Sequence, residues 1–274
     1  MLKPSQFHQL PNNVTPVKYN LTLSPDLEQF VFNGEEDIEI TIDCQTSQIV
    51  VNSADLTIVS ASLTLSSGEI VEVITIDYDE IQETVGLSLA KPVEPGKGRL
   101  YIQFTGTLND KLHGFYRSTY ASPNGTTNTL AVTQFEPTDA RRAFPCWDEP
   151  AIKASFTVNL IVPEELSAIS NMPIVDETSI GNGLKKVRYK ETPKMSTYLL
   201  AFIIGDMESI ETTASDGTLI RVFTTPGKIA SNQLNRHVTW KSLNEWFRRS
   251  KELGRFGYPC SPRKCSASRA AMQP

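Results

Sequence analysis

Long apolar runs are missing from this 274-residue sequence, and so is an apolar segment near its start. A membrane-spanning helix needs about 18 or more apolar residues in a row, and a secretory signal needs an apolar core. The sequence therefore predicts a chain with neither a membrane anchor nor an export signal. The net charge of −5 argues against nucleic acid as a partner, because nucleic-acid-binding domains are usually basic.

Cysteine and histidine are scarce as well. The four cysteines are Cys44, Cys146, Cys260 and Cys265, and the three histidines are His8, His113 and His237. The cysteine positions show no disulfide framework, so a reducing, cytoplasmic location is expected. No histidine is followed by glutamate and no two are four residues apart, so the zinc-binding pattern H-E-x-x-H is absent. We therefore expect no zinc to bind to this chain.

Alternation of apolar and polar residues dominates the part of the chain before residue 225. The clearest example is IEITIDC at residues 38–44, where Ile38, Ile40, Ile42 and Cys44 are predicted to point inward. Shorter or similar runs predict strands at 19–23, 56–65, 70–78, 85–89, 99–105, 129–135, 155–162 and 185–190. The apolar run at 197–204 predicts a further strand, covered on both faces.

Turn dipeptides such as Asn182-Gly183 separate these runs. Many short strands with such punctuation indicate a mainly β protein built as a large antiparallel β-sandwich. No helix is predicted before residue 228.

The carboxyl-terminal part is predicted to differ from this β region. The run 218–225 reads as one more strand, and Ser231 is a suitable amino-terminal cap for a helix that ends near Arg249. Residues beyond the helix are basic and offer almost nothing to bury, which predicts disorder. The expected partition is a flexible terminus at 1–9, a β domain at 10–210, the opening of a second domain at 211–249 and a disordered tail at 250–274.

One stretch, TQFEPTDARRAFPCWDEP at residues 133–150, is far more polar than a connection between strands requires. Gln134 and Glu136 stand two apart at the end of a predicted strand, so they are expected to project from the same face. An amide beside a carboxylate suits a positively charged donor such as an amine. Pro137 is expected to end the strand, because it has no N–H to donate.

The remainder of that stretch reads as a scaffold. Arg141 and Arg142 are expected to form ion pairs with acids of the same stretch, namely Asp139, Asp148 and Glu149. The apolar run 144–147 would form a buried plug beneath them. Residue chemistry alone leaves a plain alternative open, in which the whole stretch is a stabilised crossover loop without a binding role.

The string FEPTDARRAFPCWDEPAIKASF resembles a hallmark of the zinc aminopeptidases of the aminopeptidase N and puromycin-sensitive type. Further strings are similar to that family in the same order along the chain: LPNNVTPVKYNLTLSPD, FNGEEDIEI, FTGTLNDKLHGFYRS, ISNMP and TPKMSTYLLAFIIGD. The resemblance covers roughly residues 10–240.

This resemblance implies a saddle-shaped amino-terminal β domain, followed by the truncated start of a thermolysin-like catalytic domain. It implies that Glu136 binds the free α-amino group of a peptide and that Gln134 lines the pocket for the first side chain. Peptides with a free amino terminus would be the partners, and zinc would be the cofactor of the full-length family. Family members tend to have a cis peptide bond after this glutamate, so the Glu136–Pro137 bond is predicted to be cis.

The sequence also departs from the family pattern. It contains neither H-E-x-x-H nor the family's G-A-M-E-N motif, and GYPCSPRKC only partly matches the family's Y-P-L-P-K. We expect a truncated or alternatively read product that is inactive alone, a true isoform being the other explanation. Two other hypotheses remain open at this point. One is a non-catalytic module that binds peptides or pairs with a full-length homologue, and the other is an unrelated β-sandwich with a structural role.

Overall fold

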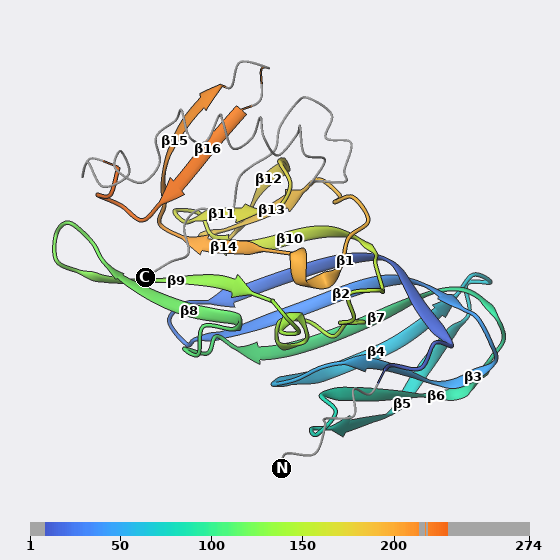
Figure 1. The fold of residues 1–274 in the computed structure, drawn as a ribbon. Coiled ribbons are helices and arrows are strands. Elements are labelled where there is room, and N and C mark those ends of the chain that lie inside the picture. Colours follow the sequence, from blue (N-terminus) through green and yellow to red (C-terminus); the bar gives the residue numbers. More distant parts are fainter. Residues whose placement is uncertain (1–8, 214–216, 218, 230–274) are drawn as a thin grey trace, which may run out of the picture.

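The computed structural model describes residues 9–213, 217 and 219–229. This part of the chain consists of sixteen strands and two short 3-10 turns, without an α-helix (Figure 1). The strands are β1 Val14–Asp26, β2 Val31–Ile42, β3 Thr46–Asn52, β4 Leu56–Leu65, β5 Ile70–Asp79, β6 Thr84–Val93, β7 Gly96–Thr107, β8 Gly114–Ala121, β9 Thr127–Gln134, β10 Ser155–Pro163, β11 Ser167–Ser170, β12 Ile174–Gly181, β13 Leu184–Tyr189, β14 Phe202–Gly205, β15 Glu208–Thr213 and β16 Leu219–Thr224. The 3-10 turns are η1 Ala140–Arg142 and η2 Thr197–Leu199.

Ten strands form one large sheet in the order β12-β13-β10-β1-β2-β7-β4-β5-β6-β3. The alternation in β2 confirms its sequence pattern, because Ile38, Ile40 and Ile42 are all buried. Cys44 is exposed, so the prediction that it points inward was wrong. The strand ladder stops at Ile42, which pairs with Val14 of β1 and Gly96 of β7. The alternation in the sequence continues to Cys44, two residues past the end of the strand.

The sequence pattern predicted a purely antiparallel sheet, but the large sheet contains one parallel pair. β1 pairs with β2 in antiparallel fashion on one side and with β10 in parallel fashion on the other, where Leu21 lies opposite Val158. Both kinds of pairing give the same two-residue alternation of side chains, so the sequence pattern does not distinguish them.

A second sheet of four strands, β11-β14-β9-β8, packs against the large one (Figure 1). An aromatic contact joins the two layers, since the ring of Phe32 in β2 lies 5.1 Å from that of Phe115 in β8. Within the second sheet, the ring of Phe115 lies 5.0 Å from that of Phe202 in β14. One continuous cluster of buried apolar side chains includes residues of both sheets. The mainly β, sandwich-type fold is therefore confirmed.

The strand predicted at 197–204 is wrong in its first half. Residues 197–199 form η2, and only Phe202–Gly205 is a strand. Ser196 Oγ donates to the Pro150 carbonyl at 2.8 Å, and Thr197 Oγ1 donates to Asp148 Oδ1 at 2.6 Å. These buried polar contacts hold the chain in a turn, although its apolar composition suits a strand.

Five strands were not predicted: β3, β8, β11, β12 and β15. β12 shows why, since all eight of its residues are exposed and no buried face leaves an alternating pattern. The predicted strand at 218–225 is β16, which pairs with β15 in a small two-stranded sheet. The predicted boundary between residues 210 and 211 falls inside β15.

Other predictions lie outside the described residues. They are most of the flexible terminus 1–9, the helix from Ser231 to about Arg249 and the basic tail 250–274.

Candidate functional site

Gln134 is the last residue of β9, and the strand is held along its length by β8. Its partner across the hairpin is Gly114, where an added Cβ would lie 2.8 Å from the Cβ of Arg142. Gly114 also has a φ of +70°, a conformation that glycine adopts readily. The start of β8, which pairs with the end of β9, is therefore packed closely against the loop that follows β9.

Phe135 anchors the chain between the two predicted site residues. Its side chain is 2% exposed, and its ring lies 6.1 Å from Phe144 and 5.9 Å from Phe202. Gln134 is half-buried and Glu136 is exposed, so the buried ring separates two polar side chains at the surface. Hydrophobic burial of Phe135 fixes where the flanking residues leave the sheet.

Glu136 lies in a turn that directly follows the strand. The Asp139 N–H donates to the Phe135 carbonyl at 2.9 Å and closes this turn. The Glu136–Pro137 peptide bond is cis, as predicted. Gln134 Nε2 donates to the Glu136 carbonyl oxygen at 3.4 Å, so the structure brings the two predicted residues together.

The loop 140–149 forms the base of this turn. The predicted plug is confirmed, since Phe144, Cys146 and Trp147 are each at most 1% exposed. The backbone N–H of Trp147 donates to the Tyr19 hydroxyl oxygen at 3.2 Å, and Cys146 forms a backbone bridge with Asn52. The plug thus joins the candidate site to β1 and β3 of the large sheet.

Arg141 is fixed by acids near the plug. Its Nε donates to Asp148 Oδ2 at 3.1 Å, and its Nη1 donates to Glu83 Oε2 at 3.1 Å. Asp148 is 3% exposed, so this is a largely desolvated pair. The predicted Arg141–Asp148 contact is confirmed, whereas Glu149 accepts the Leu10 N–H at 2.7 Å.

Arg142 contacts three carboxylates, those of Asp139, Asp55 and Glu83. Burial lowers the pKa of Arg142, but hydrogen bonds to Asp139 and Asp55 and the charge of Glu83 outweigh it and raise the pKa. Sequence reasoning found Asp139 and missed Asp55 and Glu83. No signal in the sequence separates these two acids from the other acids of surface turns.

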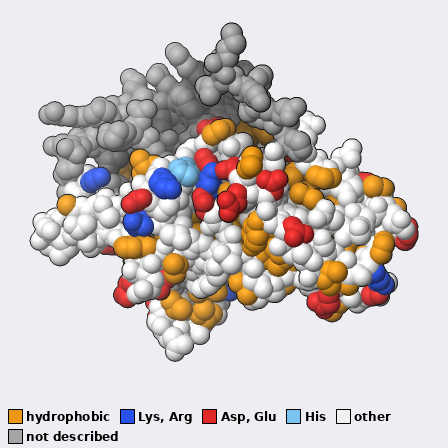
Figure 2. Space-filling model, turned by 90° about the horizontal axis from the view of Figure 1, so that it is seen from below, with side chains coloured by type: hydrophobic (Ala, Val, Ile, Leu, Met, Phe, Trp, Pro, Cys, Tyr) orange, Lys and Arg blue, Asp and Glu red, His pale blue; other side chains and the backbone are white. Residues whose placement is uncertain are grey.

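His113 lies at the edge of the same group. Its Nδ1 is 3.5 Å from Asp139 Oδ1, and its carbonyl accepts a hydrogen bond from Asn109 Nδ2 at 3.0 Å. Figure 2 shows basic, acidic and histidine side chains gathered on one face of the molecule. The turn that carries Glu136 is therefore surrounded by charged groups that hold one another.

Cys146 is not an available nucleophile. Burial raises the pKa of its thiol well above the ordinary value, and the charge of Asp148 adds to the effect. The thiol therefore stays protonated at neutral pH and acts as a small apolar group in the plug.

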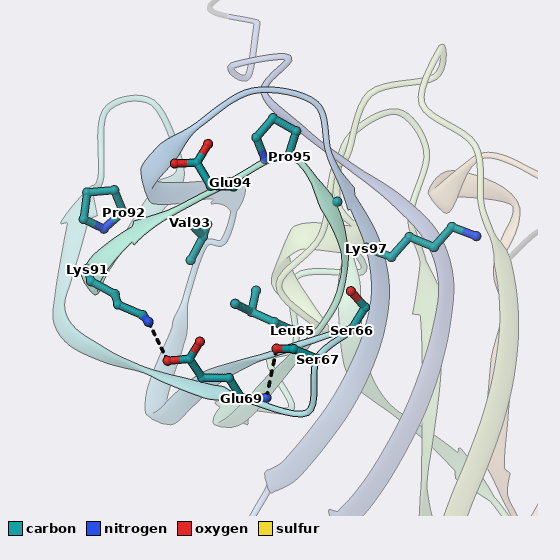
Figure 3. Close-up of a pocket in the computed structure, with 11 residues that line it drawn as sticks. Leu65, Ser66, Ser67, Glu69, Lys91, Pro92, Val93, Glu94, Pro95 and Lys97 are labelled. Atoms are coloured by element: carbon teal, nitrogen blue, oxygen red, sulfur yellow. Dashed lines mark hydrogen bonds and ion pairs between the residues drawn. The ribbon is translucent and has the colours of Figure 1, made fainter.

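A hollow with a volume of about 270 Å³ lies elsewhere, between the β4–β5 and β6–β7 turns (Figure 3). Lys91 and Glu69 on its rim pair with each other. None of the residues that line it belongs to the stretch 133–150. The candidate site is thus a surface turn and not this hollow.

Within the described ranges, no three histidine, cysteine, aspartate or glutamate side chains lie close enough together to hold a metal ion. His113 Nδ1 lies 3.5 Å from Asp139 Oδ1, the oxygen that also accepts a hydrogen bond from Arg142 Nε. The described residues therefore offer no group of side chains that fits zinc. The same residues contain no helix that is long and apolar enough to span a membrane.

Residues 15–199 match the Peptidase M1 N-terminal domain. The chain belongs to this family. The match begins within β1 and ends at η2, so it covers the large sheet almost completely, three of the four strands of the second sheet and the whole stretch 133–150.

Curated relatives agree with this assignment. The chain is 44% identical over 236 residues to Aminopeptidase M1-D of Oryza sativa subsp. japonica, covering 86% of this chain and 26% of the relative. It is 42% identical over 246 residues to the Puromycin-sensitive aminopeptidase of Caenorhabditis elegans, covering 88% and 26%. Aminopeptidase N of Acetobacter pasteurianus is 38% identical over 235 residues, covering 86% and 64%. The chain thus spans about a quarter of the first two relatives.

Proposed function

We propose that this chain is the substrate-recognising β domain of a zinc aminopeptidase, a hydrolase that removes residues from the free amino terminus of peptides. In this proposal Glu136 binds the α-ammonium group of the peptide, and Gln134 lines the pocket for the first side chain. A carboxylate that faces an ammonium group forms a charge-assisted contact and rejects peptides without a free amine.

The observation that carries the proposal is the placement of Glu136. It lies on an exposed turn directly after β9, and the buried side chain of Phe135 and the Asp139–Phe135 hydrogen bond fix that turn. Gln134 reaches the same turn through its side-chain amide. A carboxylate carried by a fixed turn beside an amide suits recognition of an amine, and the relatives are named as aminopeptidases.

We further propose that this chain alone does not hydrolyse peptides. Its 274 residues include neither H-E-x-x-H nor G-A-M-E-N, so it supplies no known means of activating water. Zinc would be held by other parts of a family member. Acting alone, the chain would be a module that binds peptides, in the cytosol as its cysteine pattern suggests.

Binding measurements test the role of Glu136. Isothermal titration of the purified chain with leucylglycylglycine is expected to show binding, and the N-acetylated peptide is expected to show none. Glu136→Gln should weaken binding of the free-amine peptide roughly tenfold or more, because a charged hydrogen bond becomes a neutral one. Equal affinity for both peptides would contradict the proposal.

An aminoacyl-arylamide assay with added zinc tests inactivity. No turnover is expected from the wild-type chain. Zinc-dependent turnover that is lost in Glu136→Ala would refute inactivity of the isolated chain.

A further inference from the structure

Arg142 is the point at which three segments distant in sequence meet. Its Nε donates to Asp139 Oδ1 at 2.9 Å, and its two terminal nitrogens bind Asp55 and Glu83. Asp55 lies between β3 and β4, Glu83 lies between β5 and β6, and Asp139 closes the turn that carries Glu136. The Arg142 side chain is only 18% exposed, so solvent screens these contacts less than those of a free surface pair.

Glu83 presents its carboxylate from a fixed backbone. Its φ of +52° lies in the left-handed region, which a residue with a side chain adopts only when its surroundings hold it there. Its carbonyl oxygen accepts the Ser53 N–H at 3.0 Å. Its two carboxylate oxygens are shared between Arg141 and Arg142. One side chain therefore connects the β5–β6 turn to both arginines.

Asp139 connects this network to the turn. Its N–H closes the turn onto Phe135, while its carboxylate binds Arg142 and lies 3.5 Å from His113 Nδ1. Since the backbone and the side chain of the same residue are both held, the turn has few ways to tilt. The direction of the Glu136 carboxylate depends on that tilt.

We propose that Glu83 is a positioning residue for Glu136. Glu83 holds Arg142, Arg142 holds Asp139, and Asp139 sets the orientation of the turn that carries Glu136. The inference rests on the proposed function, in which that orientation decides how well Glu136 meets an α-ammonium group. It extends the candidate site to a turn that lies 59 residues from Arg142 in the sequence.

Two measurements on Glu83→Gln test this inference. Glu80→Gln is the matched control, because Glu80 is an exposed acid of the same turn and makes no hydrogen bond or ion pair with other residues of the described part. Amide exchange at Asp139, followed by NMR, should be about tenfold faster in Glu83→Gln and unchanged in Glu80→Gln. The dissociation constant for leucylglycylglycine should rise roughly five-fold in Glu83→Gln alone. Glu83→Asp keeps the charge, so both its Asp139 exchange rate and its dissociation constant should lie between those of the wild type and Glu83→Gln.

Thermal midpoints and amide exchange in the core strands separate positioning from general stability. Glu83→Gln is expected to unfold at a somewhat lower temperature than Glu80→Gln, because it loses ion pairs to two arginines, but amide exchange in the core strands should stay the same in both variants. A change confined to Asp139 therefore reports on the turn. Equal Asp139 exchange in the two variants, or faster exchange with unchanged peptide affinity, would overturn the positioning role. A wild-type chain that fails to bind leucylglycylglycine would instead overturn the proposed function of Glu136. The exchange measurement would still decide whether Glu83 fixes the turn.

Discussion

Glu36 in the large sheet and Arg142 in the loop below Glu136 are both shielded from water, but the protein accommodates their charges in different ways. Glu36 is 1% exposed, and neither of its carboxyl oxygens has a hydrogen-bond partner among the described residues. Arg142 is bound to three carboxylates. Burial raises the pKa of Glu36 well above its ordinary value of 4.5, whereas Arg142 keeps its charge. The fold thus tolerates one ionisable group by protonation and the other by pairing.

Removal of the apolar plug that contacts both sheets should have the largest effect. Phe144 is fully buried, and its ring lies 5.9 Å from Tyr19 and 6.1 Å from Phe135. Phe144→Ala is expected to lower the free energy of unfolding by about 3–5 kcal/mol, because it removes buried surface and leaves a cavity. Urea unfolding measures this, with Val59→Ala, at an exposed position, as the control. A loss below about 1 kcal/mol would mean that the plug is not part of the core.

Replacement of Glu36 by an apolar residue should stabilise the protein. Glu36→Leu is expected to raise the free energy of unfolding at pH 7 by about 2 kcal/mol, because an unpaired buried carboxyl is replaced by a group that suits its surroundings. Urea unfolding at pH 7 measures the change. A less stable Glu36→Leu variant would mean that the carboxyl has a partner and that the contrast with Arg142 is false.

The pH dependence of stability gives a further check on Glu36. Since its pKa is raised in the folded state, the folded protein keeps a proton that the unfolded chain has lost. Stability should therefore fall as the pH rises past 4.5, the ordinary value, and stop falling above the raised pKa of the folded state. Urea unfolding between pH 4 and pH 8 should show this slope in the wild type and a smaller slope in Glu36→Gln. Identical slopes would show that another group titrates.

Loss of the arginine at the centre of the network should cost less than loss of the plug. Arg142→Met leaves three carboxylates near one another and is expected to destabilise the protein by about 1–2 kcal/mol at low salt. The loss should shrink as ionic strength rises, because salt screens the repulsion among the acids that remain. Thermal unfolding at 20 mM and 500 mM salt tests this. A loss that does not depend on salt would point to packing instead.

The smallest effect is expected for an exposed pair. Lys91 and Glu69 contact each other beside the hollow, and their side chains are 51% and 50% exposed. Lys91→Ala should change the free energy of unfolding by less than about 0.5 kcal/mol. A double-mutant cycle with Glu69→Ala measures the coupling between them. Coupling above about 1 kcal/mol would remove the distinction between this exposed pair and the half-buried ion pairs of Arg142.

Sequence patterns predicted most of the elements that bury one face, although they missed β3 and β8. The alternation of β2 is visible because one of its faces packs on the core, whereas β12 is exposed throughout and offers no such pattern. Cys44 was placed wrongly because alternation can continue past the last pair of a ladder. The parallel pairing of β1 with β10 was not predictable, since it depends on where the chain returns after a long connection.

The candidate site was predictable in part. Gln134, Glu136 and the plug lie close together in sequence, so one stretch and the resemblance were enough to name them as parts of one candidate site. Glu83 and Asp55 are brought to Arg142 only by the packing of separate turns. Local patterns carry no information about such contacts, and many other surface acids look the same in the sequence.

The parallel pair of β1 and β10 has a consequence for the order of folding. β1 can pair with β2 as soon as residues 31–42 have been made, but the strand that covers its other edge is not available until residues 155–163 have been made. Contacts so distant in sequence slow folding, and an open strand edge can pair with another chain in the meantime. A ribosome that stalls between these two strands would therefore release a chain prone to aggregation, and chaperone demand should be greatest in that interval.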